Sequence, residues 1–129
     1  MFTLEQIKAA HAKVKSGADF PSYINELIGL GLMKYTQFVS DGHAIYSGKN
    51  NYSVQSEAKY PAFKIADIAD SAKLKQDLKI HQQGDTNYMT FCEQAAGAGV
   101  EKWLVDMDKM TCTYYDKQDG NILTEAILG

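Results

Sequence analysis

A sequence pattern in the first half of the chain recurs at an offset of 68 residues. The segment Gly29–Tyr35 (GLGLMKY) returns as Gly97–Trp103 (GAGVEKW). The same offset, without a gap, also relates aromatic, basic and aliphatic positions on either side of that segment: Phe20 with Tyr88, Tyr23 with Phe91, Tyr46 with Tyr114, Lys49 with Lys117, and Val54 with Ile122. A repeat of this length indicates two supersecondary units of one kind, and hence an internal duplication. The alternative is that two helix-and-strand units look alike because amphipathic patterns do.

Hydrophobic periodicity assigns helices and strands to the first unit. A capping box at Thr3–Gln6 begins a helix that Ser16-Gly17 should end, and Asp19 begins a second helix that ends at Gly29 or Gly31. The period then shortens to that of strands. We predict three of them, separated by turns: 32–39, 43–46 and 52–54.

The second unit repeats this order after a connector at residues 57–70, within which 63–65 could form an edge strand. Ser71 is the expected cap of a helix that ends near Gly84, and a further helix runs from Tyr88 to Gly97 or Gly99. Three strands follow: 100–107, 110–115 and 121–127. We therefore predict an α+β fold in one domain, 1–129. It consists of two ααβββ halves (about 1–56 and 71–127) whose antiparallel three-stranded meanders join or face each other and are covered by helices.

Composition and charge exclude several functional classes. Thirteen Lys and Arg against sixteen Asp and Glu give a net charge of −3, so a nucleic-acid partner is not expected. No run without a charged residue exceeds seven residues, whereas a membrane helix needs roughly 20, so no membrane partner is expected. Glu5 and the lack of an apolar leader predict no signal peptide. The expected location is cytoplasmic, with Cys92 and Cys112 as reduced thiols.

Several segments together resemble a known family: 34–43 (KYTQFVSDGH), 79–84 with 88–92, 99–103, and 110–116 (MTCTYYD). They are similar to small uncharacterised bacterial and prophage proteins that often carry the label "phage envelope protein" (the YbcV type). The resemblance extends over nearly the whole chain. It implies a compact stand-alone domain and supplies no activity.

Aromatic residues are the most abundant candidates for a binding surface. Four lie at equivalent strand positions in the two halves: Tyr35, Tyr46, Trp103 and Tyr114. On neighbouring strands they could line a pocket or a partner-binding face. They could equally form ordinary cross-strand pairs in the core.

Asp41 and His43 flank a predicted turn, and a carboxylate can orient a histidine as a base or a ligand. Their equivalents in the second half, Lys109 and Thr111, differ chemically, so a one-sided site could lie there. Alternatively, Asp41 and Gly42 only form the turn. An enzymatic interpretation would be a small hydrolase or transferase that uses Asp41 and His43, with Cys112 as the thiol.

No metal ligand set or cofactor motif emerges. The histidines and cysteines lack the spacing of zinc sites, and the Gly-x-Gly pairs follow predicted helices, whereas a dinucleotide loop precedes one. We therefore expect no metal, no cofactor and no catalytic residues. The leading interpretation is a non-enzymatic binding or regulatory module for a small molecule or a protein, with a homodimer left open. A phage structural component is a further alternative.

Overall fold

The computed structural model describes residues 2–15 and 17–127. Its element order confirms the predicted α+β fold with two ααβββ halves. The helices are α1 (Leu4–His11), α2 (Phe20–Leu30), α3 (Ser71–Gln82) and α4 (Tyr88–Gly97), with short 3₁₀ turns η1 (Gly17–Asp19) and η2 (Lys49–Asn51). The strands are β1 (Leu32–Phe38), β2 (Ala44–Gly48), β3 (Ser53–Gln55), β4 (Lys102–Asp106), β5 (Thr111–Tyr115) and β6 (Asn121–Ala126).

The two meanders join edge to edge into one antiparallel sheet. Its strand order is β3-β2-β1-β4-β5-β6, so the first strands of the two halves form the central pair. Thr36 pairs with Leu104 at the middle of this junction. The pairs Tyr35–Tyr46 and Trp103–Tyr114 occupy corresponding positions in β1–β2 and β4–β5. Strand register therefore follows the offset of 68 residues, and common descent of the two halves remains a prediction.

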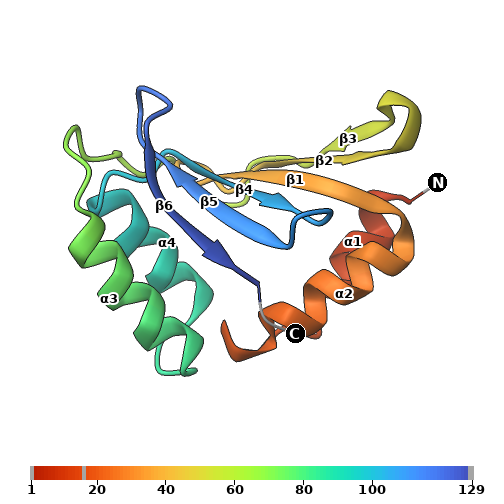
Figure 1. Cartoon of the computed structure of the whole chain (residues 1–129), viewed down its shortest axis with the longest axis horizontal. Helices are drawn as coiled ribbons and strands as arrows, with labels where there is room; N and C mark the ends of the chain where they lie inside the picture. Colours follow the sequence, from red (N-terminus) through yellow and green to blue (C-terminus); the bar gives the residue numbers. More distant parts are fainter. Residues whose placement is uncertain (1, 16, 128–129) are drawn as a thin grey trace.

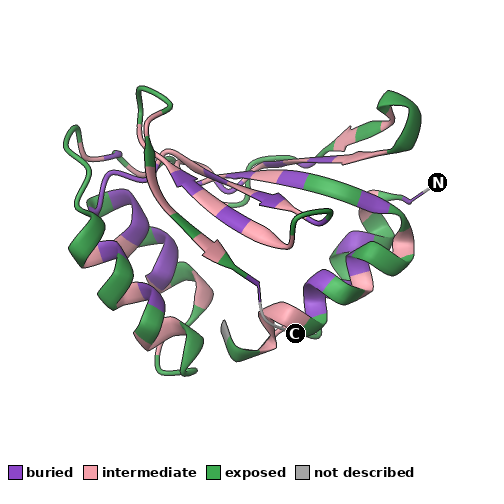
Figure 2. Cartoon of the chain, viewed as in Figure 1, coloured by how far each residue is buried: buried purple, intermediate pink, exposed green. Residues whose placement is uncertain are grey.

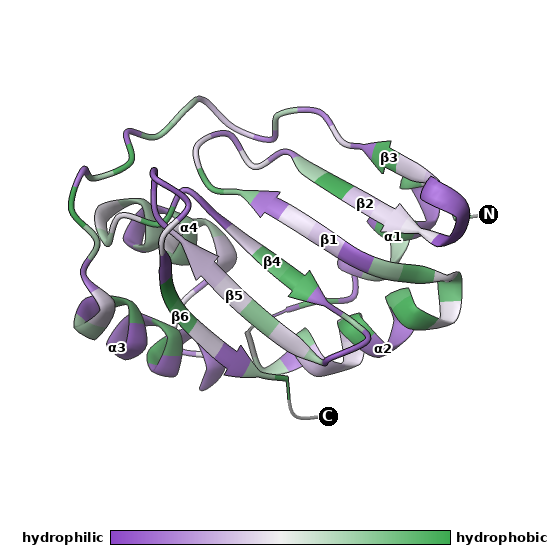
Figure 3. Ribbon diagram, turned by 45° about the horizontal axis from the view of Figure 1, so that its top comes forward, coloured by the Kyte–Doolittle hydropathy of each residue, from purple (hydrophilic) through white to green (hydrophobic). Residues whose placement is uncertain are grey.

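All four helices lie on the same side of the sheet, as two separate pairs (Figure 1). The pair α1–α2 lies below the strands of the first half, and α3–α4 lies below those of the second. Buried residues follow the helix faces that point toward the sheet (Figure 2). The opposite face has no helix over it, and its strands carry a mixture of hydrophilic and hydrophobic residues (Figure 3). We call these the inner and outer faces. In the described chain, no helix combines the length and apolarity needed to cross a bilayer.

Local sequence signals explain where most helices begin and end. The Thr3 hydroxyl accepts a hydrogen bond from the Gln6 amide, and the Gln6 side chain accepts one from the Thr3 amide, at 3.2 and 2.8 Å. This capping box was predicted. At the end of α2, Gly31 adopts φ +104°, a left-handed conformation that glycine adopts without a steric penalty.

The strand bounds differ from the predicted ones by one or two residues, and three further details differ from the prediction. Helix α1 ends at His11 because the amides of Lys13 and Val14 donate hydrogen bonds to carbonyls three residues earlier, which tightens the chain into turns. Ser16, part of the predicted helix stop, lies outside the described residues. The cap of α3 is Asp70, one residue before Ser71, and its carboxylate accepts a hydrogen bond from the Lys73 amide at 3.0 Å. Residues 63–65 form no strand.

The connector 57–70 follows the ends of the central strands. The amides of Lys59 and Phe63 donate hydrogen bonds to the carbonyls of Asp41 and Ser40, each at 2.7 Å. Further along, the Ala66 amide bonds to the Ala96 carbonyl in α4. The connector is therefore fixed to both halves, and it closes one end of the space between the helix pairs and the sheet.

Candidate ligand-binding cavity

A cavity of about 680 Å³ lies between the two helix pairs, against the inner face of the sheet. Side chains from all four helices, from five strands and from the connector line it. Small-molecule sites typically occupy roughly 300–1,000 Å³ and are mostly apolar with a few placed polar groups. The cavity therefore has the dimensions of a small-molecule site.

The sheet contributes aromatic rings from four consecutive strands. Successive side chains alternate between the two faces of a strand, and the register places Tyr35, Tyr46, Trp103 and Tyr114 on the inner face. Ring centroids of Tyr35 and Tyr46 are 5.5 Å apart, and those of Trp103 and Tyr114 are 6.0 Å apart. Four of the six predicted ligand-binding residues thus meet on one cavity wall.

The helices contribute further rings from below. The His11 ring, at the end of α1, meets Tyr23 of α2 and Tyr88 of α4 edge-on, with centroids 5.4 and 5.5 Å away. On the other side, His81 stacks on Phe91 at 4.6 Å. His11 therefore contacts aromatic residues of both halves across the cavity.

Tyrosine hydroxyls gather within this aromatic lining. Tyr23 and Tyr46 share a hydrogen bond, and the Tyr35 side chain interacts electrostatically with Tyr23, Tyr46 and Tyr88. We refer to these four residues as the tyrosine cluster. Burial is the main cause that raises the pKa of each, so all four remain neutral phenols that can donate and accept hydrogen bonds.

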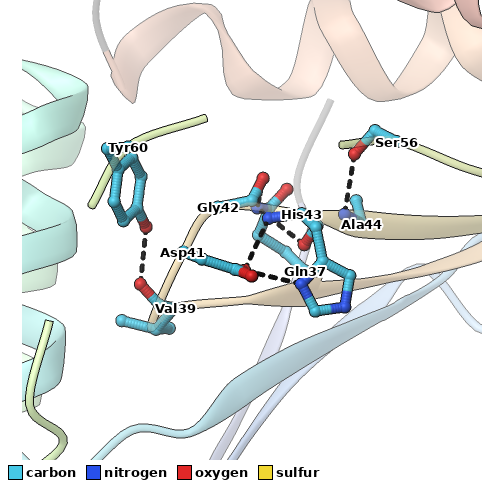
Figure 4. Close-up of polar contacts among 8 residues, drawn as sticks. All are labelled: Gln37, Val39, Asp41, Gly42, His43, Ala44, Ser56 and Tyr60. Carbon is cyan, nitrogen blue, oxygen red and sulfur yellow. Dashed lines mark hydrogen bonds and ion pairs between the residues drawn. The ribbon is translucent and has the colours of Figure 1, made fainter. Parts of the chain in front are cut away.

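Asp41 and His43 lie in the turn between β1 and β2 (Figure 4). Neither lines the cavity, although Gly42 between them does. The Asp41 carboxylate accepts hydrogen bonds from the His43 amide at 3.0 Å and contacts the ring Nδ1 at 2.6 Å. The ring stacks on Phe38 at 4.2 Å, on the outer face. Burial raises the pKa of Asp41, but the His43 contacts outweigh it and hold that pKa below its usual value. The pair stabilises the turn.

The two cysteines are buried in the inner layer. Burial raises the pKa of Cys112 to about 12 and also raises that of Cys92, so both are protonated thiols at neutral pH. Cys112 faces the cavity on β5, whereas the His43 ring lies on the outer face, with the sheet between them. Within the described residues, no group of three His, Cys, Asp or Glu side chains could hold a metal ion.

Sequence reasoning missed most of the helical lining and one polar strand residue. Tyr23 and Tyr88 stood out only as parts of apolar helix stripes, and His11 lies outside any motif. Gln37 lines the cavity from β1, and its side-chain amide donates hydrogen bonds to the carbonyls of Gly42 and His43, at 2.9 and 3.3 Å. The alternation of β1 could have identified Gln37, because it shares the face of Tyr35.

These features define an α+β protein with an interior cavity between two helix pairs and one sheet. The chain belongs to the family described as "Protein of unknown function (DUF1398)", whose model matches residues 8–126. Membership of an uncharacterised family is thus confirmed, and the phage-envelope label is not.

Three uncharacterized proteins illustrate the similarity to curated relatives. Rv2012 of Mycobacterium tuberculosis and Mb2035 of Mycobacterium bovis are each 33% identical over 66 residues, which is 51% of this chain and 37% of those proteins. YcgX of Escherichia coli is 31% identical over 52 residues, 40% of this chain and 39% of that protein. The matched part of the chain therefore spans well under half the length of these relatives, and their names supply no activity.

Proposed function

We propose that this protein is a non-enzymatic binding module that holds a small, largely apolar molecule in the inner cavity. The observation that carries the proposal is the 680 Å³ space lined by aromatic rings from both halves. Burial of apolar ligand surface against such rings supplies affinity, and the tyrosine hydroxyls supply orientation. The module would act in the cytoplasm, where its two free cysteines stay reduced.

A small molecule is favoured over a protein partner because the aromatic residues face inward. Tyr35, Tyr46, Trp103 and Tyr114 are each at most 7% exposed, so a protein surface could not reach them without separating the helices from the sheet. A regulatory role follows if ligand occupancy stabilises the contacts between the two helix pairs.

The other two interpretations have less support. A hydrolase or transferase would need Asp41 and His43 near Cys112, and the sheet separates these groups. A phage structural component rests on the resemblance alone. It would be favoured by higher-order assembly of the purified protein, and disfavoured by a monomer or homodimer at all concentrations.

Trp103 provides a direct test because it is the single tryptophan of the chain and it lines the cavity. The uncharged probe N-phenyl-1-naphthylamine should bind saturably at one site and quench Trp103 emission by energy transfer. Cys112→Phe adds bulk into the cavity and should weaken binding at least tenfold.

Thr113→Phe is the matched control. Thr113 neighbours Cys112 on β5, and the strand alternation directs it to the outer face, so this variant should bind the probe like the unmodified protein. Circular dichroism confirms that both variants fold. If Cys112→Phe binds as tightly as Thr113→Phe, the probe lies elsewhere and the cavity proposal is wrong.

A further inference from the structure

The charged side chains that line the cavity are distributed unevenly. Lys8, His11 and Lys59 contribute from α1 and the connector, whereas Glu125 contributes from β6. The ion pairs found among the described residues use other lysines, so the ammonium groups of Lys8 and Lys59 have no carboxylate partner there. Both lysines are exposed, so the rim of the cavity on this side carries positive charge that no carboxylate of the described residues pairs with.

The two kinds of charge lie at different ends of the cavity. The Lys59 amide is bonded to the Asp41 carbonyl, beyond the last residue of β1. In the strand register, Glu125 of β6 lies opposite Cys112, near the first residue of β5. Its carboxylate accepts a hydrogen bond from the Gln82 side chain at 3.4 Å. Since β1 and β5 are both antiparallel to β4, they run in the same direction. The end of β1 and the start of β5 then lie at opposite ends of the sheet along the strand direction.

His11 connects the positive end to the tyrosine cluster. Its ring contacts Tyr23 and Tyr88 edge-on. His11 and Lys59 line the same cavity. Burial lowers the pKa of His11, and the Lys59 ammonium lowers it further. A line of hydrogen-bond donors thus runs from Lys59, past His11, to the phenols in the interior.

Within this cluster Tyr35 lies at the cavity wall. The residue is 4% exposed and lines the cavity. Burial raises the pKa of its hydroxyl and keeps it a neutral phenol. Such a phenol can donate a hydrogen bond to a ligand oxygen.

Part of the wall that the second half contributes is apolar, although His81, Gln82 and Glu125 also line the cavity. Trp103 and Phe91 face each other at 5.8 Å, and Leu78 of α3 lies on the same side of the cavity. Their rings and methyl groups can hold only an uncharged, hydrophobic part of a ligand. The two sides of the cavity therefore suit the two ends of an amphipathic molecule.

We infer that the ligand is an aromatic acid, whose acidic group lies among Lys59, His11 and the tyrosine hydroxyls and whose ring system packs on Trp103 and Phe91. This inference rests on the proposed function. Cations attract the acid, and phenols donate hydrogen bonds to its oxygens. An amine would meet Lys8 and Lys59 with like charge.

A matched series of probes tests the chemistry of the polar end. Biphenyl-4-acetic acid, 4-biphenylmethanol and 4-biphenylmethylamine share one ring system and differ in the polar group. By isothermal titration calorimetry at pH 7 and low salt, the acid should bind at least tenfold more tightly than the alcohol, and the amine most weakly. Lys59→Met should reduce the affinity for the acid several-fold and leave the alcohol unchanged. Lys49→Met, at a turn outside the cavity, is the control.

Tyr35→Phe tests the hydroxyl separately. It should weaken binding of the acid and leave biphenyl itself unaffected, whereas Tyr115→Phe on the outer face should change neither. Equal affinities for acid, alcohol and amine, or a preference for the amine, would overturn the inference. If N-phenyl-1-naphthylamine still binds at the cavity in that case, the proposed function stands, and if it does not, both fail.

Discussion

The two halves of the molecule share a backbone plan but offer different chemistry to the cavity. The first half contributes three phenols from Tyr23, Tyr35 and Tyr46, and the second half contributes Phe91 and Trp103 with two phenols from Tyr88 and Tyr114. Strand register is nearly the same in both. The repeated pattern thus sets the shape of the cavity, and the replacement of two phenols by Phe91 and Trp103 at equivalent positions makes its two sides chemically different.

The largest expected effect on stability comes from truncating a buried leucine in the core of either half. Leu27 in α2 and Leu74 in α3 are fully buried, so Leu27→Ala and Leu74→Ala should each lower the free energy of unfolding by about 2–5 kcal/mol. Because the sheet is continuous across β1 and β4, both variants should unfold in one transition. Urea titrations followed by far-ultraviolet circular dichroism and by Trp103 fluorescence measure this directly.

Trp103 lies in the second half, which makes Leu27→Ala the informative variant. Its fluorescence and circular dichroism midpoints should coincide and shift together. Met33→Ala, at an exposed position on β1, should change stability by less than about 0.5 kcal/mol. A Trp103 midpoint that stays at the unmodified value in Leu27→Ala would show that the halves unfold independently.

An intermediate effect should distinguish two equivalent glycines. Gly31 and Gly99 differ by 68 residues and both have positive φ. A Cβ at Gly31 would meet open space, whereas one at Gly99 would lie 2.8 Å from the Ala69 Cα and 2.9 Å from the Ile68 carbonyl oxygen. Gly31→Ala should cost about 1 kcal/mol for the left-handed conformation, and Gly99→Ala should cost more because the connector must also move.

Thermal unfolding of the two alanine variants side by side measures that difference. Gly29→Ala serves as the control, since it lies within α2 with open space around it and should raise stability by about 0.5–1 kcal/mol. Equal losses in Gly31→Ala and Gly99→Ala would contradict the close packing of the connector against the second half.

The smallest effect concerns the two cavity histidines. Burial lowers the pKa values of His11 and His81 in the folded protein; Lys59 adds to the shift at His11, and the hydrogen bond to Thr86 opposes it at His81. The unfolded chain therefore binds these protons first as the pH falls. The neutral forms of His11 and His81 therefore contribute fully to the free energy of unfolding above about pH 6.5. This contribution is lost as the pH falls through their folded-state pKa values.

The melting temperature should consequently decline as the pH is lowered from 7.5 to 5. The double variant His11→Gln, His81→Gln should show a smaller decline over the same range. The single variants should give intermediate slopes. If the double variant declines as steeply as the unmodified protein, other groups control the pH dependence in this range.

Much of the fold could be predicted because its signals are local. The Thr3 capping box, the left-handed Gly31 and the alternation of strand residues each depend on a few neighbouring positions, and each matches the structure. The expected first cap of the second half, Ser71, lies one residue after the observed cap, Asp70, since both residue types are good caps. The joining of the meanders through β1 and β4 was one of two options, because edge pairing depends on residues far apart in the chain.

The cavity was only partly predictable for the same reason. The repeat identifies Tyr35 and Trp103 as equivalent strand positions, but which face of the sheet carries helices is a tertiary property. Asp41 and His43 were adjacent in sequence to β1 and β2 and were grouped with the aromatics, yet the turn places the His43 ring against Phe38 on the outer face. His11 reaches the cavity through helix packing, which no spacing in the sequence reveals.

The central strand pair also has a consequence for how the chain folds. Paired residues in β1 and β4 are 64 to 72 positions apart, whereas those in β1 and β2 are separated by 7 to 16. Closing the longer loop costs more chain entropy, and non-local pairing slows folding. We expect each meander to form early and the junction to form last. The cavity, which needs both helix pairs, then comes into existence only at the final step of folding.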